Sequence, residues 1–286
     1  MEVPMSRLGQ TSLEPLEPYD GKLSSTVLRG ESPRKGADLL DVPPNGGKLH
    51  PIKCNSNNDM SMRKLFQTIN KGEFETVKQI ILRQPEVVNN KSVGLLKRDE
   101  GQTPLRIAVK NSFPKMTMLF VENDADLNAY TSEDDMYIIH QAIYTVIQYA
   151  CSGKIHLRDR EFKEKGIVSD YTQNLYDEDK QLFDISYSIL EYLIKQGIDL
   201  SVKTKMGNCF SYGIILSSAS FFPRTSIDDV PQEICRRVEK VFSLLLSTKV
   251  DTVLSDYVRK NYTLEKQDAL EKWRKKVLSL CEKQYI

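Results

Sequence analysis

Apolar residues recur at spacings of three and four along much of the chain, a pattern that predicts amphipathic α-helices. The first clear example is residues 65–82, LFQTINKGEFETVKQIIL. Its apolar residues fall into two groups separated by Lys71-Gly72-Glu73, which predicts two helices joined by a turn. We expect the second helix to end at Gln84-Pro85, because proline cannot continue the hydrogen-bond ladder of a helix.

The same helix–turn–helix pattern returns in residues 99–129, DEGQTPLRIAVKNSFPKMTMLFVENDADLNA. Thr103 is expected to cap the first helix, and Pro104 fits its first turn. A second apolar run, residues 116–121, is expected to stop at Asn123-Asp124. A single pair of this kind cannot bury its own apolar face, so we expect neighbouring pairs to stack.

Four segments that contain predicted second helices align without gaps. All four carry apolar residues at their fourth, fifth and sixth positions, and the last three carry aspartate at the eleventh, as Asp126, Asp199 and Asp251. The starts of the segments are 39, 73 and 52 residues apart, so the repeats are irregular. The segments are VKQIILRQPEVV from Val77, MTMLFVENDADL from Met116, ILEYLIKQGIDL from Ile189 and VFSLLLSTKVDT from Val241.

The second and third segments start 73 residues apart, which is longer than the other two spacings. The first helix of this pair is predicted from Tyr137 to about Ala150, and its partner from near Leu182. Residues 151–181 are polar and of mixed charge, and we interpret them as an insertion in the turn between the helices. The gap is long enough for a degenerate repeat, but it contains no second apolar pair. If the insertion is correct, deleting residues 152–180 should leave folding cooperative and weaken a partner.

The fourth pair is predicted at residues 214–219 and 231–246, and one more helix is predicted from Thr263. This last helix has an apolar side and a basic side, as expected of a helix that caps the final pair. Its apolar side consists of Leu270, Trp273, Val277 and Leu280.

Residues 1–60 differ in composition from the rest of the chain. They contain seven of the twelve prolines, six of the fourteen glycines and a single aromatic residue, Tyr19. Such a segment has little to bury and is expected to be a disordered tail. Ser32, followed by Pro33, is a possible phosphorylation site.

The overall charge and the cysteines limit the classes of function. The formal charge is +1 and the isoelectric point is near 7.6. The chain as a whole therefore has no electrostatic attraction to nucleic acid or anionic lipid. We expect neither nucleic acid nor membrane as a partner. The five cysteines are widely spaced and odd in number, which argues against a disulfide framework. No apolar run approaches the roughly 18 residues of a membrane span. These features favour the cytoplasm, the nucleus or both.

Two motifs in residues 99–129 resemble the ankyrin repeat: Gly101-x-Thr-Pro-Leu-x-x-Ala and, about twenty residues later, Asp-Ala-Asp-Leu-Asn-Ala. The resemblance implies an all-α fold, an ankyrin-repeat solenoid of about four stacked helix–turn–helix units. The expected organisation is a disordered tail (1–60), a repeat domain (61–258) with its insertion at 151–181, and a C-terminal capping helix (259–286).

The sequence contains no pattern typical of a catalytic or metal site, and we expect no cofactor. The three histidines, His50, His140 and His156, lack the spacing of metal ligands. His140 falls on the family's histidine position, where the resemblance implies a hydrogen bond to the backbone of a neighbouring repeat. Arg106 occupies that position in the preceding unit.

The resemblance therefore implies a non-enzymatic protein–protein interaction module, an adaptor or scaffold that is monomeric on its own. It would bind a protein through its hairpin tips and concave surface, with Tyr130 and Tyr137 as aromatic anchors. A regulatory or inhibitory subunit of an enzyme or signalling complex is the alternative. The expected partner-binding residues are Arg98, Glu100, Gln102, Arg106, Lys110, Tyr130, Ser132, Asp134, Asp135, Gln141, Lys203 and Lys205.

Overall fold

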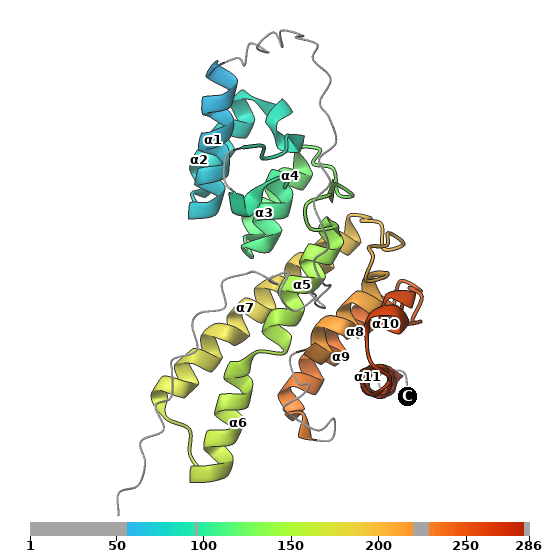
Figure 1. The fold of residues 1–286 in the computed structure, drawn as a ribbon. Helices are drawn as coiled ribbons and strands as arrows, with labels where there is room; N and C mark the ends of the chain where they lie inside the picture. Colours follow the sequence, from blue (N-terminus) through green and yellow to red (C-terminus); the bar gives the residue numbers. More distant parts are fainter. Residues whose placement is uncertain (1–55, 95–96, 220–228, 283–286) are drawn as a thin grey trace, which may run out of the picture. The chain divides into compact units, whose positions relative to one another are not determined.

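The structure, a computed structural model, describes residues 56–94, 97–219 and 229–282, and these residues are mostly helical (Figure 1). The predicted disordered tail lies outside the described residues as far as residue 55, and so does Ser32. The predicted boundary at residue 60 is too late, because helix α1 begins at Ser56. Its first residues, SNNDM, have no apolar spacing that could mark a helix start.

The first two helix pairs follow the sequence prediction closely. Helix α1 (Ser56–Lys71) packs against α2 (Phe74–Arg83), and α3 (Pro104–Lys110) packs against α4 (Pro114–Glu122). The Thr103 hydroxyl caps α3 by accepting a hydrogen bond from the backbone N–H of Arg106 at 3.4 Å. Two short 3₁₀ helices, η1 (Pro85–Asn89) and η2 (Lys97–Asp99), lie between the pairs along the chain.

The third pair consists of α5 (Ile138–Ala150) and α7 (Asp170–Lys195). A hairpin of two short strands, β1 (Tyr130–Thr131) and β2 (Met136–Tyr137), precedes it. The partner helix was predicted to begin near Leu182, and this is wrong by about three turns. Between the two helices, α6 (Gly153–Lys165) packs against α7, so the residues predicted as an insertion form a helical hairpin (Figure 1).

Local signals explain why the hairpin folds as helices despite its polar composition. The hydroxyls of Ser152 and Ser169 cap α6 and α7 by accepting from the N–H groups of Lys154 and Thr172. Gly166 ends α6 in the left-handed conformation, with φ of 71°. Few large apolar residues of this hairpin are buried, so its helical periodicity is weak in the sequence.

The last part of the described chain contains α8 (Cys209–Ala219), α9 (Gln232–Leu246), α10 (Asp256–Asn261) and α11 (Leu264–Glu282). Helix α11 packs on α8 and α9, in agreement with the prediction of a covering helix. The Trp273 side chain is fully buried, and its Nε1–H donates to Ser217 Oγ at 2.8 Å. Leu280 is only half-buried, and Cys281 takes its place in the core.

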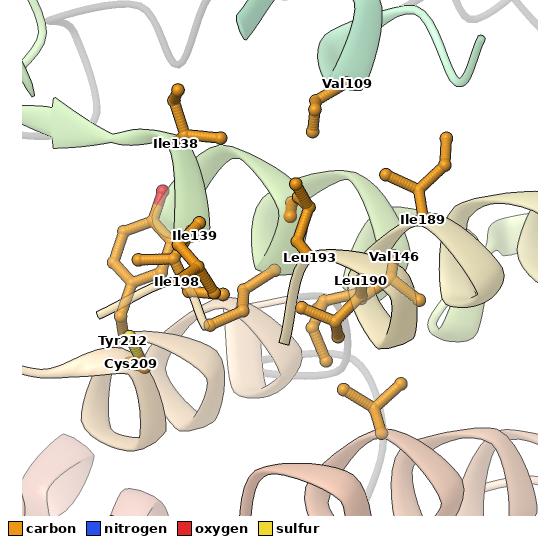
Figure 2. Packing of buried hydrophobic residues seen from close by; sticks show 14 of the residues in the cluster. Val109, Ile138, Ile139, Val146, Ile189, Leu190, Leu193, Ile198, Cys209 and Tyr212 are labelled. Atoms are coloured by element: carbon orange, nitrogen blue, oxygen red, sulfur yellow. The ribbon is translucent and has the colours of Figure 1, made fainter. Parts of the chain in front are cut away.

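The pairs are stacked on one another. The first helices α1, α3, α5 and α8 contact each other in succession, and the second helices α2, α4 and α7 do the same. Figure 2 shows apolar side chains of α5 and α7 facing each other, among them Ile139, Val146, Leu190 and Leu193, with Tyr212 of α8 alongside. One continuous set of buried apolar residues extends from α1 to α11, so each pair buries the face that its neighbour exposes.

The backbone repeats in the same register that the sequence alignment gave. Three second helices are followed, two or three residues after their last residue, by a residue with positive φ at the ninth position of the aligned segments: Asp124 (61°), Gly197 (84°) and Lys249 (60°). Two residues further on, Asp126, Asp199 and Asp251 each accept a hydrogen bond on Oδ1 from the backbone N–H two residues ahead, at 2.9, 2.7 and 3.0 Å. The aligned aspartates therefore form the same turn three times.

Asparagine side chains connect consecutive turns. The Asn89 Oδ1 atom accepts from the backbone N–H of Asp126 at 2.7 Å, and the Asn128 Oδ1 atom accepts from that of Asp199 at 3.0 Å. Asn89 and Asn128 hold equivalent positions, just after the aligned segments from Val77 and Met116. Each bond therefore joins one unit to the next. No described helix has the length and apolar character needed to cross a membrane.

Candidate functional site

Three loops that lead into first helices share one backbone feature. Gly101, Asp135 and Gly207 all have positive φ, at 72°, 56° and 113°, and each lies a few residues before α3, α5 or α8. Neighbouring loops also bond to each other: the N–H of Lys205 donates to Asp135 Oδ2 at 2.8 Å. The exposed side chains of the second and third loops are here called the tip row, which consists of Tyr130, Ser132, Glu133, Asp134, Lys203 and Lys205.

The second loop carries two aromatic residues in contact. The rings of Tyr130 and Tyr137 lie 4.9 Å apart between centroids, and the Tyr130 hydroxyl donates to Asp135 Oδ1 at 2.9 Å. This hydrogen bond raises the pKa of Tyr130 above its ordinary value. The backbone carbonyl of Tyr130 accepts from Lys91 Nζ at 2.8 Å. Tyr130 is 38% exposed, so one predicted anchor is accessible and held in a fixed orientation.

Three residues predicted at the partner surface are buried, so the expectation that they are exposed is wrong. Gln102, Arg106 and Gln141 are 6%, 1% and 5% exposed. The Arg106 guanidinium forms a bidentate ion pair with the Asp134 carboxylate and donates to Gln141 Oε1 at 3.3 Å. The two terminal nitrogens of the guanidinium are satisfied in this way, whereas Nε has no partner among the described residues. The ion pair fixes the second loop from below.

The first loop offers fewer free groups than the sequence suggested. Lys110 is half-buried and pairs with the buried Asp99, whose other carboxylate oxygen accepts from Asn70 Nδ2 at 2.7 Å. Glu100 is half-buried and accepts from the backbone N–H of Gly94 on both oxygens. Arg98 lies in η2, and its side chain is outside the described part of the chain.

The tip row continues into a hollow that the sequence did not indicate. It has a volume of about 460 Å³ and lies between the loop at residues 203–208, residues 251–255 and α10. We call it the α10 groove. A second hollow of about 300 Å³ shares Val253, Leu254, Ser255 and Arg259 with it. Lys203 and Lys205 belong to both the tip row and the groove, so two of the predicted residues lie at its wall.

Groups that often carry out chemistry in proteins are buried here. His140 is fully buried, and burial lowers the pKa of its imidazole to about 4, against an opposing effect of the Gly207 backbone. The predicted hydrogen bond from His140 to a neighbouring backbone is not observed, because neither of its buried ring nitrogens has a hydrogen-bond partner among the described residues. Burial raises the pKa of the Cys209 thiol to about 12 and also raises that of Cys151. These groups are thus a neutral imidazole and protonated thiols at neutral pH.

A buried charge cluster attaches the α6–α7 hairpin to α9. Arg237 of α9 and Asp179 of α7 are 3% and 2% exposed and pair at 3.0 Å. The guanidinium also pairs with Glu233 at 3.0 Å and donates to the carbonyl of Tyr149 at 3.0 Å. At the tip of the hairpin, by contrast, large apolar side chains are exposed. They are Phe162 (58%), Ile167 (70%) and Tyr171 (72%).

Comparisons with known proteins give no family for this chain: no protein-family model matches it, and no curated protein is similar to it in sequence. The acidic and cysteine or histidine residues in the described ranges form no cluster of three that could hold a metal ion.

Proposed function

We propose that this protein is a non-enzymatic interaction module, an ankyrin-like solenoid of about four repeats that binds a protein partner through the tip row. Three kinds of repetition support the ankyrin-like fold: the stacked helix pairs, the positive-φ residues before three of the first helices, and the aspartate turns after three of the second helices. The free thiols among the described cysteines suit the cytoplasm or the nucleus.

The observation that carries the proposal is the fixed geometry of the tip row. Arg106 holds the second loop from below, Asp135 links it to the third loop, and the exposed side chains project from this frame. A surface that is ordered before binding loses less conformational entropy when a partner docks. Polar tips of both signs beside an accessible tyrosine have the composition of a specific, non-obligate interface.

The tip of the α6–α7 hairpin is a second proposed contact. Three exposed large apolar residues within ten positions are unusual on a surface that has no partner. The hairpin is fastened to α9 by the Arg237 cluster, so its tip has a defined position relative to that helix. A partner would contact the tip of the hairpin and the tip row through different parts of its own surface.

Affinity capture with a matched pair of variants tests the proposal. The bait is the full chain, compared with the variant Y130A/S132R, which leaves the residues of the α10 groove unchanged, and with a control variant, Q79R, in which an exposed residue of α2 gains the same charge. Proteins captured by the wild type and the control but lost from the tip-row variant support the proposal. Equal capture by all three baits, with the variants folded by circular dichroism, overturns it.

An activity assay on the captured partner separates an adaptor from a regulatory subunit. If the partner is an enzyme and its turnover changes when purified chain is added, the module regulates it. Unchanged turnover with stable co-purification indicates a scaffold. Turnover of a small molecule by the purified chain alone would contradict the non-enzymatic part of the proposal.

A further inference from the structure

The α10 groove brings together cations from segments about fifty residues apart in the sequence. Lys203 and Lys205 come from the loop before α8, and Arg259 and Lys260 come from α10. All four side chains are exposed at the wall of the hollow. Its volume of about 460 Å³ lies within the range of pockets that hold ligands.

The acidic residues of the groove do not neutralise these cations. Asp256 forms a loose, exposed pair with Arg259 at 3.8 Å. Asp251 Oδ1 accepts from the backbone N–H of Val253 in the repeated turn. Lys203, Lys205 and Lys260 make no ion pair with any residue that the structure describes. The groove therefore has a net charge of +2 from its lining residues, concentrated on three lysines.

An apolar side chain lines the groove together with these charged residues. Val253 is 59% exposed and lines both the α10 groove and the adjoining hollow. The adjoining hollow is balanced in charge, because Arg274 pairs with Glu271 there at 2.6 Å. A ligand that fits this surface thus needs anionic groups for the lysines and an apolar group for Val253.

We propose that the α10 groove binds a short acidic segment of a partner protein, with carboxylates at the three lysines and an apolar side chain on Val253. The inference rests on the proposed function and names the kind of partner surface. In an extended segment, alternate side chains point to one face, so carboxylates can reach the lysines at intervals. A nucleic-acid strand has a phosphate at every nucleotide and would bring charge onto Asp251 and Asp256 as well.

Fluorescence anisotropy with the purified full chain tests the inference. The probe is a labelled peptide, Gly-Asp-Glu-Leu-Glu-Asp-Gly, and the reference is the same peptide with Asn and Gln in place of Asp and Glu. We expect the acidic peptide to bind at least tenfold more tightly, and its affinity to fall as salt is raised from 50 to 200 mM. A labelled ten-nucleotide oligothymidylate is the third probe.

Two charge-reversal variants locate the binding. The groove variant K203E/K205E/K260E should weaken the acidic peptide at least tenfold. The control variant K78E/K115E/K180E has the same net charge and reverses exposed lysines on α2, α4 and α7, so it should change affinity less than twofold. A carbodiimide, which joins a carboxylate to a lysine amine with loss of water, should couple the peptide to Lys203, Lys205 or Lys260 as mapped by mass spectrometry.

Three results would overturn the inference: equal binding of acidic and amide peptides, equal weakening by the groove and control variants, or tighter binding of the oligonucleotide than of the acidic peptide. None of these results bears on whether capture of a protein depends on the tip row. Conversely, failure of the capture experiment with intact peptide binding would reject the tip row as the partner surface and leave the groove as a peptide site. The two failures are therefore distinguishable.

Discussion

Replacement of Asp179 by alanine should destabilise the protein by about 3 kcal/mol. The substitution leaves the Arg237 guanidinium 3% exposed and without its closest buried counter-charge. Removing one partner from a buried ion pair typically costs ~3–5 kcal/mol, because the other charge stays buried. We expect the lower end of that range, because Glu233 still pairs with Arg237 through Nε at 3.0 Å.

The pair itself is expected to contribute little net stability. Burial raises the pKa of Asp179 above its ordinary value, although Arg237 opposes this shift. Desolvation of the carboxylate therefore outweighs its attraction to the guanidinium. The double variant D179L/R237M, which removes both charges, should accordingly be more stable than D179A. It should stay about 1 kcal/mol below the wild type, because the carbonyl of Tyr149 loses its donor.

Urea unfolding and thermal unfolding, each followed by circular dichroism at 222 nm, measure the stability of D179A and of D179L/R237M. For a domain of this size, 3 kcal/mol corresponds to a fall in melting temperature of about 6–12 °C. The control is D184A, on the same helix, because Asp184 and Lys240 pair at 3.8 Å and are about half exposed. Such a surface pair is worth less than ~1 kcal/mol. If D179A and D184A cost the same, or if D179L/R237M is the least stable variant, the reasoning is wrong.

Three further predictions concern stability. Burial lowers the pKa of His140 to about 4, so between pH 6.5 and pH 4 only the unfolded chain takes up this proton, and stability falls as pH falls. The wild type should lose up to about 3 kcal/mol more than H140F across that range in urea titrations. Gly207→Ala should lower the free energy of unfolding by about 2 kcal/mol more than Gly197→Ala in the same assay. Both positions have positive φ, but only at Gly207 would a new Cβ lie 2.7 Å from Ser255 Cβ. Trp273→Ala should lower stability by about 3–5 kcal/mol in calorimetry, since it empties a fully buried site under α11.

The helix pairs were predictable because each carries several local signals that agree. Thr103 and Pro104 mark the start of α3 in the sequence, and the cap forms as expected. Asp124 was expected to tolerate a left-handed backbone, and its φ is 61°. The aligned aspartates were recognised by spacing alone, and all three form the same turn. Signals of this kind act within a few residues, so a single sequence contains them.

The burial of polar residues was not predictable, because it depends on partners far away in the sequence. Arg106 carries a charge on the polar side of a short helix, which normally indicates exposure. Its partners Asp134 and Gln141 lie 28 and 35 residues further on. Asp179 likewise lies in a polar stretch that suggests a solvent-exposed carboxylate, but it is buried against Arg237, 58 residues further on. The α10 groove was not predictable for the same reason, because its two walls come from separate segments. Only Lys203 and Lys205, on one wall, were expected to bind a partner.

Because the α6–α7 hairpin is packed on α9, deletion of residues 152–180 no longer tests partner binding separately from stability. The removal of residues 152–180 was expected to leave folding cooperative, but it would delete Asp179 and leave the guanidinium of Arg237 buried. A shorter change separates binding from stability: F162S/I167S/Y171S alters only exposed side chains at the tip of the hairpin. It should weaken partner capture with the melting temperature unchanged within about 2 °C. A large loss of stability would show that the tip packs against the rest of the protein.

The long repeat between Asp135 and Gly207 keeps regular tip loops because its extra residues lie between α5 and the body of α7, at the opposite end of the unit. Gly101 and Asp135 are 34 positions apart in the sequence, whereas Asp135 and Gly207 are 72 apart, yet all three have positive φ two or three residues before a first helix. The α6–α7 hairpin that accounts for the difference lies in the turn between α5 and the body of α7, away from these loops along both helices. The Asn89 and Asn128 hydrogen bonds join consecutive units at the loop end regardless of this insertion. Insertions between the helices of a pair can therefore vary in length while the tip row keeps its geometry, and this is the property that a recognition surface needs.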